Sequence, residues 1–317
     1  MAVAHLRLRL LAAMVVALVG LQGGSSATFT ISNNCGYSVW PGLLSSAGSA
    51  PLSTTGFALA PGASQAVAAP AGWSGRMWGR TLCATTDGAR FACATGDCGS
   101  GDVQCNGGGA APPATLAEFT LDGSGNLDFF DVSLVDGYNL PMLVTPISNA
   151  AAASASSGKC AATGCVAELN SACPADLRVA SASSSSVACR SACDAFGSAE
   201  YCCSGAYGNP NTCRPSAYSE FFKSACPRAY SYAYDDSTST FTCAAGATDY
   251  AITFCPNAGT PTSVKSSGQN PQAAGLPQLN DTMVYFGGGG GNPQASGATT
   301  AAYSLAAVLI PVALLLL

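Results

Sequence analysis

Two segments in the middle of the chain alternate between apolar and polar residues, and each carries an acid at a polar position. The segment TLAEFTL (115–121) contains Glu118, and LDFFDVSLV (127–135) contains Asp131. Because successive side chains of a β-strand point to opposite faces, both acids are expected to project away from the apolar faces of their strands. The apolar positions that define these faces are Ala117, Phe119, Leu121, Phe130, Val132 and Leu134.

The N-terminal half of the chain favours strands. Residues 28–31 (TFTI) alternate in the same way, and frequent Gly, Pro and Asn residues interrupt the later runs. Short strands separated by turn residues are typical of a β-sandwich. Asp136 and Gly137 follow the second acidic strand, and this pair predicts a turn that ends it.

The composition shifts toward helix and cysteine-rich loop between Cys160 and Cys226. Ser216 can cap a helix there, and Pro227 blocks its continuation. The apolar residues at helical spacing are Tyr218, Phe221, Phe222 and Ala225. We therefore expect a second, smaller lobe held by disulfides.

The N-terminus has the three parts of a secretory signal peptide. Arg7 and Arg9 precede an apolar run, and small residues follow that run. This order predicts a signal peptide over 1–27, cleaved after Ala27 or after Ser26. The alternative is an N-terminal membrane helix, for which the apolar run is short compared with the ~20 residues of a span.

Two further segments are predicted beyond the cysteine-containing body. Residues 257–296 are rich in Gly, Pro, Ser, Thr, Gln, Asn and Ala, which predicts a flexible stalk because few apolar side chains are present to offset the ordering entropy. The stalk holds Asn280 in an N-glycosylation sequon.

Residues 297–317 end in an apolar run without a following basic residue. This pattern predicts a glycosylphosphatidylinositol (GPI) signal attached at Ser296, with a tail-anchored helix as the alternative. Rival attachment sites are Gly290 and Gly291.

Charge and cysteine content restrict the partners. Without Arg7 and Arg9, the 12 basic residues become 10, against 17 acidic residues, so the net charge of about −7 disfavours a nucleic-acid partner. Sixteen cysteines behind a signal peptide predict disulfides. Zinc is the competing use, but zinc sites usually contain CxxC pairs or histidines, and the only histidine is His5 in the signal peptide. We expect no metal and no cofactor.

Carboxylates are the reactive groups that remain once the signal peptide is removed and the cysteines are paired. The loss of His5 removes histidine-based triads, and disulfide formation removes thiol nucleophiles. Two carboxylates that flank a glycosidic bond can hydrolyse it, one as the acid and the other as nucleophile or base. Among hydrolytic reactions, glycoside cleavage is therefore the one whose catalytic groups this chain can best supply.

Several motifs resemble segments of the thaumatin-like family, across about 230 of the 317 residues. RFACATGDCGSGDVQC (90–105) is similar to the family's cysteine-rich signature, and DFFDVSLVDGYNLPM (128–142) and YSEFFKSACPRAYSYAYDD (218–236) match further segments in the same order. All sixteen cysteines are in register with the larger members of the family. The chain departs from the family pattern at Ala89, often a glycine, and at Arg228, often an aspartate.

The resemblance implies a mainly β fold. A β-sandwich core would comprise residues 28–80, 119–166 and 227–256, with a small disulfide-rich loop region (81–118) and a helical, disulfide-rich lobe (167–226). Counting cysteines cannot select a pairing, but the resemblance implies one. The implied pairs are Cys35–Cys255, Cys83–Cys93, Cys98–Cys105, Cys160–Cys243, Cys165–Cys226, Cys173–Cys189, Cys193–Cys202 and Cys203–Cys213.

The resemblance also implies a cleft that one arginine and four acids line. In members of the family, this cleft is associated with antifungal action and with binding, and sometimes weak hydrolysis, of β-1,3-glucans, and the resemblance implies the same here. The matching positions here are Arg76, Glu118, Asp131, Asp136 and Asp235, with Asp236 directly beside the last of them.

Three roles are open for this cleft. In catalysis, like charges would raise the pKa of Glu118 and make it the acid, with Asp131 or Asp136 as base or nucleophile, while Arg76 keeps one carboxylate ionised. The acids could instead bind sugar hydroxyls without turnover, or form a structural ion-pair network. We expect a monomeric defence or cell-wall protein at the outer face of the plasma membrane or in the apoplast, which binds β-1,3-glucan-type polysaccharide. The alternatives are a weak endo-β-1,3-glucanase and a structural or protein-docking role.

Overall fold

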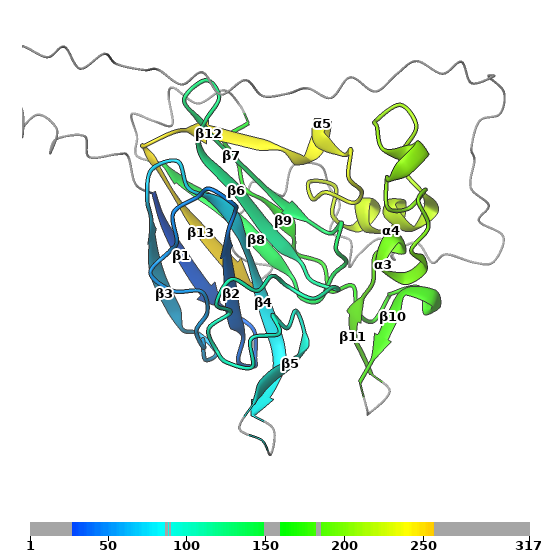
Figure 1. The fold of residues 1–317 in the computed structure, drawn as a ribbon, viewed down its shortest axis with the longest axis horizontal. Helices are drawn as coiled ribbons and strands as arrows, with labels where there is room; N and C mark the ends of the chain where they lie inside the picture. Colours follow the sequence, from blue (N-terminus) through cyan, green and yellow to red (C-terminus); the bar gives the residue numbers. More distant parts are fainter. Residues whose placement is uncertain (1–26, 86–87, 89, 149–158, 182–184, 257–317) are drawn as a thin grey trace, which may run out of the picture. The chain divides into compact units, whose positions relative to one another are not determined.

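Two β-sheets face each other across a hydrophobic core (Figure 1). The structure is a computed structural model that describes residues 27–85, 88, 90–148, 159–181 and 185–256. The five-stranded sheet has the order β3 (Ser64–Ala69), β1 (Ala27–Asn33), β13 (Thr248–Phe254), β8 (Met142–Ser148), β9 (Thr163–Cys165). The six-stranded sheet has the order β12 (Phe241–Ala244), β7 (Leu127–Ser133), β6 (Leu116–Gly123), β4 (Ser74–Thr85), β2 (Trp40–Ser45), with β5 (Phe91–Thr95) paired to β4.

Aromatic side chains from both sheets meet in the core. Phe29 and Tyr250 come from the five-stranded sheet, and Phe119 and Phe130 come from the six-stranded sheet; all four are buried. The ring centroids of Phe29 and Phe119 are 4.7 Å apart, and Tyr250 lies 5.2 Å from both Phe119 and Phe130. Because each such ring buries about 150–250 Å² of surface, this cluster holds the two sheets together.

The predicted alternation of β6 and β7 is confirmed. The apolar residues on the core faces of both strands are buried, whereas Glu118 and Asp131 point to the other face. Asp128 is a carboxyl on the core side of β7, only 1% exposed. It is satisfied by hydrogen bonds, since Tyr250 Oη donates to Oδ2 at 2.8 Å and the Asp122 amide donates to Oδ1 at 2.9 Å. Burial raises the pKa of Asp128.

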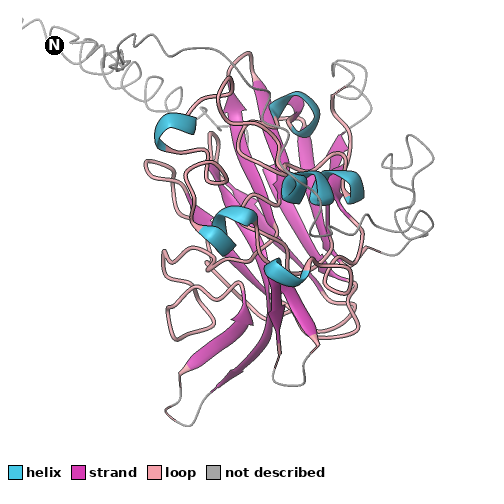
Figure 2. Ribbon diagram, turned by 90° about the vertical axis from the view of Figure 1, so that its right-hand side faces the viewer, coloured by secondary structure: helices cyan, strands magenta, loops and turns pink. Residues whose placement is uncertain are grey.

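Helical segments gather on one side of the sheets (Figure 2). The predicted helix is confirmed as α4 (Ala217–Ala225), which buries Phe221 and Phe222 and begins at the Ser216 cap. The Ser216 hydroxyl accepts a hydrogen bond from the Ser219 amide, as a capping box requires. The other elements of this part are η1 (Ala175–Leu177), β10 (Arg178–Ala180), β11 (Ser186–Cys189), α3 (Ala192–Phe196), η2 (Gly205–Tyr207) and α5 (Asp236–Ser239).

All sixteen cysteines form disulfides, and the eight pairs are those that the resemblance implies. The Cys35–Cys255 bridge spans 220 residues and joins the two ends of the folded body. Two element boundaries differ from expectation. β4 continues to Thr85 and β6 begins at Leu116, so both ends of the expected loop region 81–118 belong to the six-stranded sheet.

The first described residue already belongs to the fold. Ala27, the last residue of the expected signal peptide, begins β1 and pairs with Ala69 of β3. The rest of that segment, the expected stalk with Asn280 and the expected anchor site Ser296 lie outside the described residues. Among the residues that the structure describes, no helix is long and apolar enough to cross a membrane.

Candidate functional site

A row of cross-strand partners forms the floor of a polar cleft on the outward face of the six-stranded sheet. Arg76 of β4 lies opposite Glu118 of β6, and Glu118 lies opposite Asp131 of β7. Leu44 of β2 extends the row beyond Arg76. Directly opposed residues have Cβ atoms about 4.5–5.5 Å apart. The register of the sheet therefore brings one arginine and two acids together.

Two adjoining cavities share this row. The first, of about 500 Å³, also contacts Thr120 and Phe129. The second, of about 410 Å³, also contacts Asp136, Tyr230 and Asp236. The side chains common to both are Arg76, Glu118 and Asp131. The charged row thus lies between the two halves of one open cleft.

Burial raises the pKa of both carboxyls of the row. Burial raises the pKa of Glu118; Arg76 opposes this shift, and Asp136 adds to it. Burial, with the negative charges of Glu118 and Asp236, raises the pKa of Asp131 to about 8. Asp131 Oδ2 is buried without a hydrogen-bond partner among the described residues. Asp131 therefore holds a proton at neutral pH, next to an arginine-stabilised Glu118.

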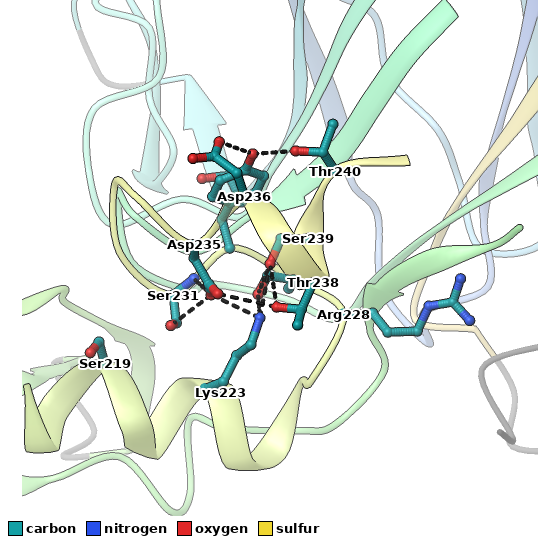
Figure 3. Close-up of polar contacts among 12 residues, drawn as sticks. Ser219, Lys223, Arg228, Ser231, Asp235, Asp236, Thr238, Ser239 and Thr240 are labelled. Atoms are coloured by element: carbon teal, nitrogen blue, oxygen red, sulfur yellow. Dashed lines mark hydrogen bonds and ion pairs between the residues drawn. The ribbon is translucent and has the colours of Figure 1, made fainter. Parts of the chain in front are cut away.

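Asp235 and Asp236 have different surroundings. Asp235, which the resemblance assigned to the cleft, contacts neither cavity; its Oδ2 lies 2.8 Å from Lys223 Nζ (Figure 3). Asp236 contacts the second cavity instead, where its Oδ1 accepts a hydrogen bond from Tyr230 Oη at 2.7 Å. The structure thus assigns the cleft position to Asp236 and an ion pair to Asp235.

The other predicted site residues lie at the cleft. Asp136 contacts the second cavity from a turn, in which the Gly137 amide donates to the Leu134 carbonyl and Gly137 has a φ of 88°. The hydrogen bond confirms the predicted turn, and the positive φ explains why glycine occupies position 137. Arg76 takes part in neither the Arg190–Asp194 nor the Lys223–Asp235 ion pair, and its positive charge opposes the rise in the pKa of Glu118.

The model of the thaumatin family matches residues 33–256. The chain belongs to the thaumatin family. This family member is 58% identical over 244 residues to thaumatin-like protein 1 of Arabidopsis thaliana, covering 75% of this chain and 89% of that protein. It is 51% identical over 247 residues to thaumatin-like protein 1 of Prunus persica, covering 78% and 97%. It is also 51% identical over 239 residues to a Prunus avium protein named glucan endo-1,3-beta-glucosidase, covering 75% and 94%.

The sequence did not reveal Tyr230 as a cleft residue of this thaumatin-family protein. Tyr230 lies in a loop without a repeating pattern, so no periodicity indicates its direction. Its backbone is nevertheless fixed to β7, because its amide donates to Val132 O and its carbonyl accepts from the Leu134 amide. Among the described residues, no group of three or more His, Cys, Asp or Glu side chains is arranged to hold a metal ion.

Proposed function

We propose that this thaumatin-like defence protein binds β-1,3-glucan-type polysaccharide in the cleft. The observation that carries the proposal is the row Arg76–Glu118–Asp131 in the middle of an open polar cleft. Sugar hydroxyls both donate and accept hydrogen bonds; Arg76 and protonated Asp131 can donate, and Glu118 can accept. Because the cleft is open, it suits an interior stretch of a polymer. The name of the Prunus avium relative supports a β-1,3-glucan as the ligand.

Aromatic side chains on either side of the row suit sugar rings. Phe129 contacts the first cavity and Tyr230 contacts the second. Aromatic faces provide apolar contact area for the carbon-bound hydrogens of a pyranose, and the Tyr230 hydroxyl adds a polar group. A glucan that crosses the row would meet Phe129 in one half of the cleft and Tyr230 in the other.

Weak endo-β-1,3-glucanase activity is the second candidate, favoured by the different charges that act on the two neighbouring carboxyls: Arg76 opposes the rise in the pKa of Glu118, whereas two acids add to that of Asp131. Asp131, with a pKa of about 8, could donate a proton to the glycosidic oxygen. Glu118, next to Arg76, could then act as nucleophile or base. These roles are the reverse of the sequence-based prediction, in which Glu118 was the acid and Asp131 was a candidate base or nucleophile.

Retention on insoluble β-1,3-glucan tests the proposal. We expect wild type to be retained and Glu118→Gln to lose roughly tenfold in affinity, because a hydrogen bond to a charged group contributes about 1.5–3 kcal/mol. Glu220→Gln is the matched control, since Glu220 is exposed on α4 and contacts neither cavity. Reducing ends are measured on soluble β-1,3-glucan in parallel.

The outcomes separate the three roles. Retention without new reducing ends supports binding alone. Reducing ends that disappear in Glu118→Gln, with folding intact, support hydrolysis. A wild type that is not retained overturns the proposal and favours a structural or protein-docking role, which crosslinking at the cell surface would then examine.

The proposal assigns the protein to the outer face of the plasma membrane or the apoplast, where it would meet wall polysaccharide. Phosphatidylinositol-specific phospholipase C should release the processed protein from cells if a GPI anchor is attached near Ser296. A chain that stays in the membrane fraction would instead favour a tail-anchored helix. Asn280→Gln should remove one N-glycan from the mass of the released protein.

A further inference from the structure

Lys223 connects three positions of the segment that forms one wall of the cleft. Lys223 lies in the last turn of α4, and its ammonium group has three N–H donors. It lies 2.8 Å from Asp235 Oδ2, donates to the Ala229 carbonyl at 3.1 Å and donates to Ser239 Oγ at 2.8 Å (Figure 3). One side chain thus ties together residues 229, 235 and 239.

Each of these three partners is followed directly by a residue of a second hydrogen-bonded group. The followers are Tyr230, Asp236 and Thr240. Tyr230 Oη hydrogen-bonds both Asp236 Oδ1 and Thr240 Oγ1, and it is the centre of this group. Tyr230 and Asp236 both contact the second cavity. Residues 229, 235 and 239 therefore contact Lys223, and the residues that directly follow them, 230, 236 and 240, form a second hydrogen-bonded group around Tyr230 at the cleft.

The Lys223–Asp235 pair is well satisfied but costly to bury. Asp235 also accepts hydrogen bonds from the amide and hydroxyl of Ser231 and from the Thr238 hydroxyl. The side chains of Lys223 and Asp235 are 25% and 10% exposed, and burial lowers the pKa of Lys223 against the effect of Asp235. Because apolar residues of similar volume often stabilise a fold as well as a buried ion pair, stability alone does not account for this pair, and a role in fixing geometry is consistent with it.

We infer that Lys223 is a positioning residue, which sets Asp236 on the cleft wall by fixing Asp235, the residue before it. Tyr230, whose backbone is already held by β7, is the hydrogen-bond partner to which Asp236 is thereby presented. Lys223 contacts neither cavity, so it acts through the backbone of the segment. The effect on ligand binding rests on the proposed function. The effect on the electrostatics of the cleft does not, because it concerns the protein alone.

Asp131 reports on the position of Asp236. The charged groups that act on Asp131 are Glu118 of β6 and Asp236 of α5, and Arg76 lies one strand further along the row. If Asp236 loses its fixed position, less negative charge acts on Asp131, and its protonation midpoint falls. The loss of the Lys223 charge alone would instead raise the protonation midpoint of Asp131, because removing a positive charge raises the pKa of a nearby acid.

The test is the titration midpoint of Asp131 in the full chain, measured by NMR of ¹³Cγ-labelled aspartate. We expect Lys223→Met to lower the midpoint, in the same direction as Asp236→Asn and by part of that shift. Retention on insoluble β-1,3-glucan should fall roughly fivefold. Lys159→Met is the matched control, because Lys159 is exposed and contacts neither cavity, and it should change neither measurement.

Ser239→Ala keeps the test decisive if Lys223→Met does not fold. It removes one Lys223 contact, together with the hydrogen bonds of Ser239 Oγ to Ala229 and Thr238, without changing any charge, so we expect a smaller fall in the midpoint. A midpoint that rises in folded Lys223→Met, or stays at the wild-type value in both variants, overturns the inference. If wild type is not retained on glucan, the proposed function fails, while the midpoint still decides the role of Lys223.

Discussion

Asp131 links the cleft to the stability of the fold. Its pKa of about 8 in the folded chain lies above the value of about 3.9 for an unperturbed aspartate. Between these values the folded chain holds a proton that the unfolded chain has lost, so stability decreases as pH rises from about 4 to about 8. We expect Asp131→Asn to raise the Tm by a few degrees at pH 8 and to leave it almost unchanged near pH 3.5, in thermal melts. The same effect at both pH values would contradict this linkage.

Single residues could be assigned from the sequence where a repeating pattern exists. The alternation of β6 and β7 predicted the directions of Glu118 and Asp131, and the same parity puts Asp128 on the core face. Asp235 and Asp236 lie where the chain leaves a loop for a short helix, so neither the period of a strand nor that of a long helix indicates their directions. Contacts with α4 decide which of the two reaches the cleft, and those contacts depend on tertiary structure.

At the scale of elements, β7 separates a binding face from a packing face. Phe129 contacts the cleft, whereas Phe130 is 1% exposed among Phe119, Phe241 and Tyr250. We expect Phe129→Ala to weaken retention on glucan with little change in the free energy of unfolding. Its neighbour Phe130→Ala should lower that free energy by about 3–5 kcal/mol. Urea unfolding and glucan retention of both variants check this, and equal destabilisation by both would argue against the assignment of faces.

The elements themselves differ in how well local signals define them. The cap at Ser216 and the helical spacing of Phe221 and Phe222 lie within ten residues, so the sequence predicted α4. The parallel pairing of β1 with β13 joins residues more than 200 positions apart, as Phe29 with Tyr250, and no local pattern selects it. The row from Arg76 to Asp131 likewise depends on strand register, which the sequence indicated only through the family resemblance.

At the scale of the whole molecule, the disulfides differ most in the length of chain they close. Cys35–Cys255 spans 220 residues and Cys193–Cys202 spans 9. In the chain-entropy model, we expect replacement of both cysteines of the long bridge by serine to cost about 5 kcal/mol, against about 2–3 kcal/mol for the short bridge. Guanidinium unfolding of the two double variants checks this. A larger loss for the short bridge would show that local contacts outweigh chain entropy.

The last strand of the domain is an interior strand, because β13 lies between β1 and β8. Until residues 248–254 are available, the five-stranded sheet exists only as a β3–β1 pair and a β8–β9 pair, each with unpaired edges. A ribosome makes those residues after all the other strands. Completion of this sheet must therefore follow synthesis of the whole domain, and until then the edges of both strand pairs are open to pairing with other chains.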